Sequence, residues 1–283
     1  MNILITGATG FVGKHLIARL KNKHELFALV RPGSDCTSLE GVHLFTFDDN
    51  IPALADYLLQ HKMDGIIHLA SLYIAEHQSN QIKDLVLSNV YLGTALLEAC
   101  KLAGVKWFLN TGTIWQNYNV PDRSDAYNPV NLYAASKQAF MVMARYYTET
   151  SAIRFCTLKL CDTYGPDDTR RKIFALFGRI AESGETLEMS PGGQLLDMVH
   201  IDDVVAGFEH LAELLDKSEC SLLPEYVLSS GRQVSLKELA SLYERKYQVK
   251  LNIVWGGRPY RAREVMKPYK GNILEGWKPA VEF

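Results

Sequence analysis

Short apolar runs alternate with longer amphipathic stretches over the first 160 residues of the chain. The short runs are typical of buried strands, and the longer stretches have the three-to-four-residue spacing of helices. The predicted strands lie near residues 2–6, 25–30, 43–47, 65–69, 105–111 and 155–160. The predicted helices lie near residues 11–21, 51–61, 82–103 and 132–149. This alternation favours the α/β class, with a doubly wound parallel sheet covered by helices on both faces.

The pattern loosens after residue 166. Helix-like stretches are expected near residues 171–183, 202–216 and 235–247, with a turn over residues 190–193. No repeat, low-complexity tract or flexible linker separates independent domains. We therefore expect a smaller C-terminal lobe that leans on the sheet and leaves a cleft beside it.

Composition narrows the range of partners. At 283 residues, with 47% hydrophobic and 22% charged residues, the chain can bury a large core. The net charge of −2 gives no electrostatic reason to expect nucleic acid or an anionic membrane as partner. No uninterrupted apolar run approaches the ~18 residues of a membrane span, and Met1 leads directly into the first strand. These features predict a cytoplasmic protein.

Cysteine and histidine offer no cofactor chemistry. The five cysteines are scattered and form no Cys-x-x-Cys pair, so reduced thiols are expected. The eight histidines are likewise dispersed, without acidic companions at metal-ligand spacing. We expect no metal site.

The first motif with chemical meaning is a glycine-rich turn, Gly7 to Gly13, between the first strand and the first helix. Gly7 permits a tight turn, Gly10 lets backbone approach a pyrophosphate, and Gly13 lets the helix pack closely on the strand. Free N–H groups at the start of that helix favour an anion. The pattern predicts a dinucleotide site formed by Gly7, Thr9, Gly10, Phe11, Val12 and Gly13.

The second motif is Tyr133-Ala134-Ala135-Ser136-Lys137. Residues four apart project from the same face of a helix, so Tyr133 and Lys137 are expected to lie about one turn apart. An ammonium beside a phenol favours the phenolate, and we expect Lys137 to lower the pKa of Tyr133 from ~10. A phenol tuned in this way is suited to general acid–base catalysis.

Together these motifs resemble the extended short-chain dehydrogenase/reductase family, of the NAD-dependent epimerase/dehydratase type. Further matches are the segments 68–71, 111–115, 164–166 and 199–204, and Asn89 with Gly93 and Thr94. The resemblance implies a Rossmann-type dinucleotide-binding domain over residues 1–166, with a sheet that later segments can complete. Residues 167–283 would then form mainly the substrate-binding lobe.

The resemblance also assigns roles around the cofactor. Leu69, Ala70 and Ser71 would lie against it, and Asp48 or Asp49 matches the family's acidic contact to the adenine, of which we choose Asp49. Tyr133 would give a proton to a carbonyl oxygen, while Lys137 would hold the nicotinamide ribose.

The identity of the cofactor is argued from the end of the second strand. An NAD-type site normally presents an acid there to the ribose hydroxyls, whereas this chain has Arg31. An arginine pairs well with a 2′-phosphate, so NADP(H) is favoured over NAD(H). Asp35 nearby could still reach a ribose, which keeps NAD(H) possible.

Other positions match the family's substrate contacts. Thr111 stands four residues before Trp115, the family's spacing for a substrate-orienting hydroxyl, and Thr113 is the second choice. Trp115 replaces the usual tyrosine, and Asp162 stands where relatives often have asparagine. Asn89 matches an asparagine that bonds main-chain groups near the active site.

The C-terminal part resembles enzymes that act on nucleotide-diphosphate sugars. Its candidate clamps for a diphosphate are Arg170, Arg171, Lys172, Arg258, Arg261 and Arg263, of which we choose Arg171 and Arg261. Leu196 departs from the arginine that such enzymes frequently have, so one phosphate contact is missing.

The leading hypothesis is an NADP-dependent reductase of a nucleotide-linked 4-keto sugar, as in deoxysugar biosynthesis. The alternatives are an NAD-dependent nucleotide-sugar epimerase and a non-catalytic dinucleotide sensor. Dehydration would need an acid pair after the hydroxyl residue, and Gly112-Thr113 supplies neither acid. By resemblance, helices 82–103 and 132–149 could form a four-helix homodimer interface. Phe140, Met141 and Met143 would then be interface residues.

Overall fold

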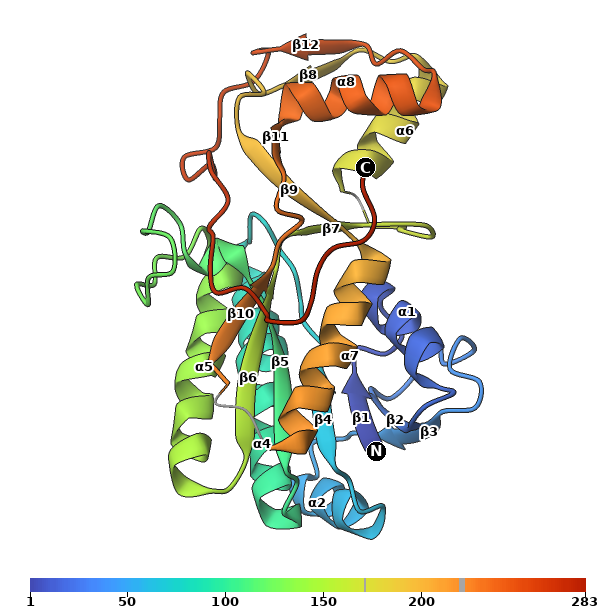
Figure 1. Ribbon diagram of the computed structural model, residues 1–283, viewed down its shortest axis with the longest axis vertical. Coiled ribbons are helices and arrows are strands. Elements are labelled where there is room, and N and C mark those ends of the chain that lie inside the picture. Colours follow the sequence, from blue (N-terminus) through green and yellow to red (C-terminus); the bar gives the residue numbers. More distant parts are fainter. Residues whose placement is uncertain (171, 219–221) are drawn as a thin grey trace.

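The computed structural model describes residues 1–170, 172–218 and 222–283. A central sheet of seven parallel strands has the order β10-β6-β5-β4-β1-β2-β3 (Figure 1). Its strands are β1 (Asn2–Thr6), β2 (Glu25–Val30), β3 (His43–Thr46), β4 (Gly65–His68), β5 (Trp107–Thr113), β6 (Arg154–Leu160) and β10 (Glu225–Leu228). All six strands predicted from the sequence belong to this sheet, which confirms the doubly wound fold.

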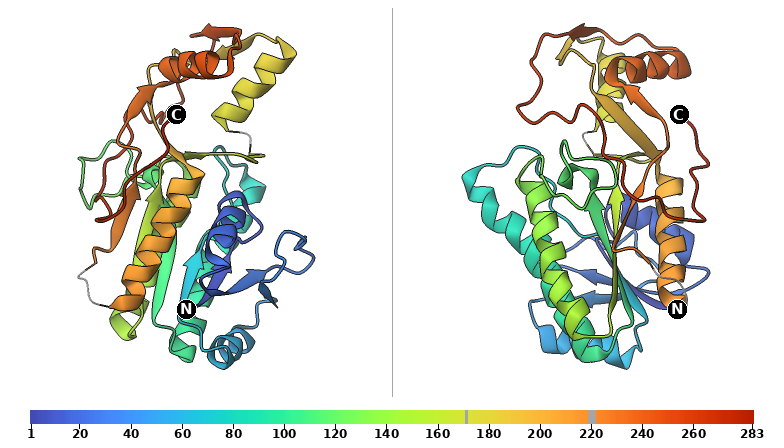
Figure 2. Two further views of the ribbon diagram at one scale, coloured as in Figure 1. Left: turned by 45° about the vertical axis from the view of Figure 1, so that its right-hand side comes forward. Right: turned by 60° about the vertical axis from the view of Figure 1, so that its left-hand side comes forward.

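Helices cover both faces of the sheet, as the right view of Figure 2 shows. One face carries α1 (Phe11–Leu20) and α7 (Ile201–Lys217). The other face carries α2 (Ile51–Gln60), α4 (Leu92–Ala103) and α5 (Leu132–Thr150). Ahead of α4 lie the short helices η1 (Ser79–Gln81) and α3 (Ile82–Val86) and a π-helical turn, η2 (Leu87–Tyr91). The predicted helix 82–103 is therefore confirmed as α3, η2 and α4 in series.

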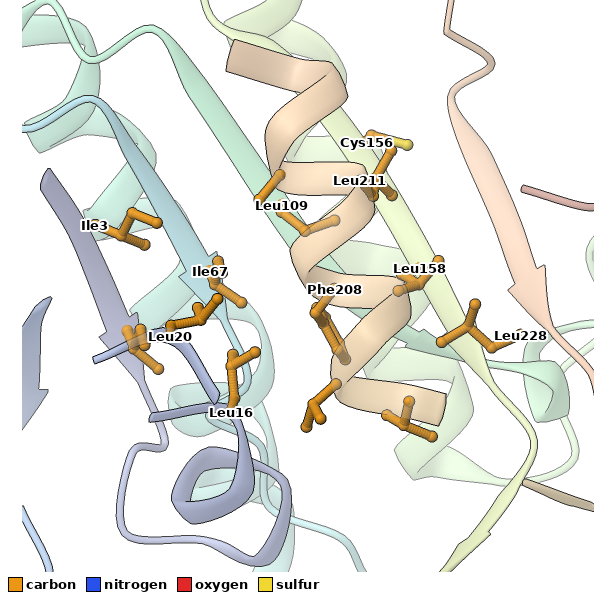
Figure 3. Close-up of a cluster of buried hydrophobic side chains, with 14 of the residues drawn as sticks. Ile3, Leu16, Leu20, Ile67, Leu109, Cys156, Leu158, Phe208, Leu211 and Leu228 are labelled. Atoms are coloured by element: carbon orange, nitrogen blue, oxygen red, sulfur yellow. The ribbon is translucent and has the colours of Figure 1, made fainter. Parts of the chain in front are cut away.

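The core between α7 and the sheet shows why this helix belongs to the large domain. Phe208 and Leu211 of α7 are fully buried and face Leu109, Leu158 and Leu228 of the strands (Figure 3). Such burial contributes roughly 1.5–3 kcal/mol for each large apolar side chain. The central sheet is thus completed by β10 and covered by α7, both of which lie after residue 166.

The smaller lobe is built from the remaining segments and stands at the carboxyl end of the sheet (Figure 1). Its elements are β7 (Asp162–Tyr164), α6 (Ile173–Ser183), β8 (Leu187–Met189), β9 (Leu195–His200), β11 (Gln233–Ser235), α8 (Leu236–Tyr247) and β12 (Ile253–Trp255). They form the sheets β11-β9-β7 and β12-β8 around a separate core that includes Phe177 and Leu239.

One helical stretch, Ser79–Ala103, is long and apolar enough to cross a membrane, with a mean hydropathy of 1.3. Leu96, Leu97 and Cys100 within it are fully buried against the sheet. The stretch therefore has the contacts of a core helix.

The strand order reverses between β1 and β4, because the chain first adds β2 and β3 on one side and later adds β5 and β6 on the other. The crevice outside the carboxyl ends of strands at such a reversal is the usual ligand position in open α/β sheets. The glycine-rich turn follows β1, and residues 69–71 follow β4.

Candidate active site

The glycine-rich turn is packed too closely for side chains. Gly7 has φ 68°, and a Cβ there would lie 2.7 Å from the Ala70 backbone nitrogen. A Cβ on Gly13 would lie 2.3 Å from the Gly7 carbonyl oxygen. The helix α1 starts at Phe11 without a side-chain cap and without an acidic residue in its first turn. Its N–H groups are thus available to an anion, as a dinucleotide pyrophosphate requires.

The loop after β4 lies against this turn. The Thr6 hydroxyl accepts a hydrogen bond from the Ala70 N–H at 3.1 Å and contacts His68 Nδ1 at 2.8 Å. Burial lowers the pKa of His68 to about 3, so the imidazole is neutral. The structure therefore brings the predicted cofactor residues Leu69, Ala70 and Ser71 beside those of the turn, which include Thr9, Gly10, Phe11 and Val12.

Arg31 and Asp49 follow adjacent strands. The Phe47 N–H donates to the Val30 carbonyl oxygen at 2.9 Å, which holds the ends of β2 and β3 together. Arg31 is exposed just after β2, and Asp49 is exposed just after β3 with a left-handed backbone, φ 68°. Both lie at the sheet edge where the adenosine half of a dinucleotide is expected.

Tyr133 and Lys137 lie one turn apart on α5. Tyr133 is half-buried, whereas Lys137 is only 1% exposed, and burial lowers the pKa of its ammonium to about 8. The expectation of a lowered Tyr133 pKa is wrong for the protein alone. Burial raises the pKa of Tyr133, and the Ser71 hydroxyl opposes this shift. The phenol is therefore protonated at neutral pH.

Asn89 ties the β4 loop to α5. Its side chain accepts hydrogen bonds from the Leu72 N–H at 2.7 Å and from the Ser71 hydroxyl at 3.2 Å. Its Nδ2 donates to the Leu72 carbonyl at 3.0 Å and to the Ser136 hydroxyl at 2.9 Å. Ser136 in turn donates to the Tyr133 carbonyl at 2.7 Å. This confirms the role that the resemblance gave Asn89.

The two candidate threonines differ in their surroundings. The Thr111 hydroxyl is buried and has no hydrogen-bond partner within the described part of the chain. The Thr113 hydroxyl caps the short helix η3 (Ile114–Gln116) and accepts from the Trp115 N–H at 3.3 Å. An unpartnered buried hydroxyl near the end of β5 is free to form a hydrogen bond with a bound ligand. The structure thus favours Thr111 over Thr113, the order expected from the sequence.

A cleft of about 1020 Å³ lies along the smaller lobe. The predicted substrate residues Asp162 and Arg261 line it, together with Trp115. Arg171, the other predicted clamp, lies outside the described residues. Burial raises the pKa of Asp162, which Lys172 and Arg170 partly offset. The cleft thus combines an acid, aromatic rings and several cations, a suitable lining for a polar ligand.

Tyr73 lies between this cleft and α5. It was not predicted from the sequence as a site residue. Its ring packs edge-on against Tyr133, with centroids 5.0 Å apart, and lies 5.8 Å from the ring of Trp115. The Lys172 ammonium lies 4.6 Å from the Tyr73 centroid. Tyr73 sits in an irregular loop, so no periodicity marked it. Through this contact Tyr133 lies between the dinucleotide crevice and the cleft.

The candidate cations separate into groups. Lys172, Arg258 and Arg261 line the cleft. Arg263 instead bonds Asn128 and stacks on Tyr118 of the large domain. Arg170 stacks on Phe11 at the start of α1. In the described residues, no group of three His, Cys, Asp or Glu side chains is placed to hold a metal ion.

The NAD dependent epimerase/dehydratase family model matches residues 3–221, so the chain belongs to this family. It is 26% identical to CDP-abequose synthase of Salmonella typhimurium, over 99% of this chain and 94% of that protein. It is also 26% identical to UDP-glucuronate 4-epimerase 2 of Arabidopsis thaliana, over 88% of this chain and 65% of that protein.

Solved structures confirm the fold. UDP-glucose 4-epimerase of Thermotoga maritima with UDP-glucose superposes with a TM-score of 0.83 at 21% identity, covering 100% of this chain and 94% of that chain. UDP-glucose 4-epimerase of Thermus thermophilus with NAD gives 0.80 at 21% identity, with coverages of 100% and 95%. The chain is thus an NAD(P)-dependent oxidoreductase of the extended short-chain dehydrogenase/reductase type.

Proposed function

We propose that this protein reduces the 4-keto group of a nucleotide-diphosphate deoxysugar, with NADPH as hydride donor. The position of Tyr133 carries the proposal, because it contacts both Ser71, a predicted cofactor residue, and Tyr73, which lines the cleft. The names of similar proteins support a sugar-nucleotide substrate. They include CDP-abequose synthase and trifunctional enzymes with a UDP-4-keto-L-rhamnose-reductase activity.

The residues supply the remaining chemistry. When bound, a nicotinamide would supply the hydride that the carbonyl carbon of the sugar needs. Tyr133 gives its proton to the carbonyl oxygen, so that an alcohol forms, and the phenolate regains a proton from solvent. The buried Lys137 ammonium stabilises that phenolate. The Thr111 hydroxyl gains a partner when it bonds the same oxygen.

Dehydration is disfavoured at this site. An acidic side chain would be needed just after Thr111, where the chain has Gly112. A Cβ on Gly112 would lie 2.8 Å from side-chain atoms of Gln116, Lys159 and Thr157. The packing therefore leaves no room for a carboxylate at this position.

NADPH is preferred because of Arg31. This side chain is exposed at the adenosine end of the crevice, where a 2′-phosphate would lie. The competing acid, Asp35, accepts hydrogen bonds from the Thr37 N–H at 3.0 Å and the Thr37 hydroxyl at 2.8 Å. These bonds engage Oδ1 of the carboxylate in its own turn.

The proposal is tested by the absorbance of NADPH and NADH with a panel of nucleotide-linked 4-keto-6-deoxy sugars. Oxidation that prefers NADPH and is lost in Tyr133→Phe supports the reductase. Retained cofactor without net oxidation overturns it, and product analysis then separates the epimerase from the non-catalytic sensor.

We also infer that the protein forms a homodimer through α3, α4 and α5. Val142, Met143 and Tyr146 on α5 are 65%, 45% and 58% exposed, and Ile82, Val86 and Leu87 extend this apolar surface. Phe140 is fully buried, so the expectation that it is an interface residue is wrong. Its ring fills the space beside Gly93 of α4.

A further inference from the structure

Arg170 lies at the start of α1, although it comes from the loop between β7 and α6. Its guanidinium carbon is 4.2 Å from the centroid of the Phe11 ring. Phe11 is the first residue of α1, directly after Gly10. The cation is therefore held beside the uncapped helix N-terminus, where the cofactor pyrophosphate is expected.

Hydrogen bonds from Nε and Nη2 fix the orientation of the Arg170 guanidinium. Asp168 accepts from Nε and from Nη2, each at 2.7 Å, and the Thr163 carbonyl accepts from Nη2 at 2.8 Å. The Asp168 side chain is 13% exposed and that of Arg170 is 34% exposed. Among the described residues, Nη1 donates no hydrogen bond. Two N–H groups of a pre-oriented arginine thus remain for an anion.

We propose that Arg170 binds the pyrophosphate of the cofactor from above the glycine-rich turn. Backbone N–H groups of α1 would contact the phosphates from one side, and Nη1 of Arg170 would contact them from the other. Asp168 acts as a positioning residue because it holds the guanidinium in place. From the sequence, Arg170 is a candidate to bind the diphosphate of the substrate. In the structure, however, the residues that line the cleft include Asp168 and not Arg170.

The arrangement links the two ligands. Thr163 and Arg170 belong to β7 and its following loop, which also contributes Asp162 and Asp168 to the cleft. A cofactor phosphate held by Arg170 would therefore fix the segment that borders the sugar. This inference rests on dinucleotide binding, and it does not depend on the direction or type of reaction.

The test is titration calorimetry of the purified full chain with NAD+ and with NADP+. We expect Arg170→Gln to weaken binding of both dinucleotides about tenfold, because both carry the pyrophosphate and a charge-assisted hydrogen bond to it is lost. Asp168→Asn should weaken both by a smaller factor. Arg145→Gln is the matched control, because Arg145 pairs with Glu149 on the exposed face of α5 and with no other acid among the described residues.

Thermal melting of each variant without ligand shows whether it is folded. If Arg170→Gln does not fold, Arg170→Lys takes its place in the titrations. Lysine keeps the charge without the fork, so a threefold or larger loss is expected. UDP-glucose, titrated in the same way, serves as the sugar-nucleotide probe. Unchanged NAD+ and NADP+ affinity in folded variants would overturn the inference, as would a loss of affinity for UDP-glucose alone. Absence of dinucleotide binding by the wild-type protein would instead overturn the proposed function.

Discussion

Asn89 donates a hydrogen bond to the Ser136 hydroxyl at 2.9 Å, which joins a π-helical turn to α5, the helix that carries Tyr133 and Lys137. The same amide holds Leu72, next to Tyr73, by its N–H and its carbonyl. One buried side chain thereby fixes Tyr133 and Tyr73 relative to each other. We regard this amide as the residue that aligns the cofactor crevice with the cleft.

Asn89→Ala should impair both stability and catalysis. It leaves the Leu72 N–H and carbonyl without their partner, at a cost of roughly 3 kcal/mol in unfolding free energy. We expect kcat to fall more than tenfold, because Tyr133 loses its alignment. Urea unfolding and steady-state kinetics measure the two effects. Asn252→Ala, which removes one exposed hydrogen bond to Gly184, should leave kcat unchanged.

Thr111→Val should separate activity from stability. Valine has the shape of threonine and removes a buried hydroxyl that has no hydrogen-bond partner in the described part of the chain, so the apoprotein should be as stable or about 1 kcal/mol more stable. Activity should fall about 100-fold, as when a donor to a reacting oxygen is lost. In the control Thr157→Val, Asn110 loses its 3.1 Å partner, and the protein should be destabilised. A fully active Thr111→Val variant would remove Thr111 from the site.

Lys137→Met should stabilise the apoprotein while it abolishes turnover. The folded pKa of Lys137 is about 8, below the value of 10.5 for an exposed lysine, so the wild-type protein is destabilised by the buried charge below pH 8. At about 1.4 kcal/mol per pKa unit, the advantage of the variant is at most about 3 kcal/mol at pH 7. It should shrink as the pH rises from 8 to 10.5, because the unfolded chain then binds more protons than the folded one.

Chemical denaturation of both proteins at several pH values checks this sign. The control is Lys21→Met, which removes a lysine from the exposed surface instead of the core. An equal difference at pH 7 and pH 10 for Lys137→Met would contradict the assigned burial effect.

Arg31→Gln should change the choice of cofactor. The affinity for NADP+ should fall about tenfold, because a charged partner of the 2′-phosphate is lost, while the affinity for NAD+ stays within twofold. Calorimetric titration with each dinucleotide measures the ratio. Wild-type protein that binds the two cofactors equally would contradict the NADP preference.

Val142→Glu with Tyr146→Glu should convert a dimer into a monomer. Both positions are exposed on α5, and buried unpaired carboxylates would oppose association. Light scattering after size-exclusion chromatography measures the mass. Ile273→Glu, at a residue that is 65% exposed and outside the helices, is the control and should remain dimeric. A monomeric wild-type protein would contradict the interface.

Much of the fold could be predicted because its strands are continuous apolar runs with one turn signal each. β10 (Glu225–Leu228) is as short as β3 and β4, but it was not predicted because it lies beyond the regular alternation of strands and helices, separated from β6 by α7 and much of the smaller lobe. The glycine turn, Tyr133 and Lys137 were found because their spacing has a direct geometric meaning. Tyr73 and the position of Arg170 depend on how distant loops meet, and no local pattern records such contacts.

The pKa of Tyr133 could not be predicted for a related reason. Spacing placed Lys137 on the same helix face, but it gave no information on burial. In the folded chain both side chains are withdrawn from water, which disfavours the phenolate and the ammonium alike. The local environment therefore sets the protonation state of this pair.

Hydride transfer from NADPH to the carbonyl carbon of the sugar is the step that defines the proposed reductase. The most direct test uses NADPH deuterated at the transferable position with a nucleotide-linked 4-keto-6-deoxy sugar, followed by mass spectrometry and NMR of the product. We predict one deuterium on carbon 4 for each NADPH consumed, and none with Tyr133→Phe. A product that carries no deuterium, or a sugar whose configuration changes without consumption of NADPH, would contradict it.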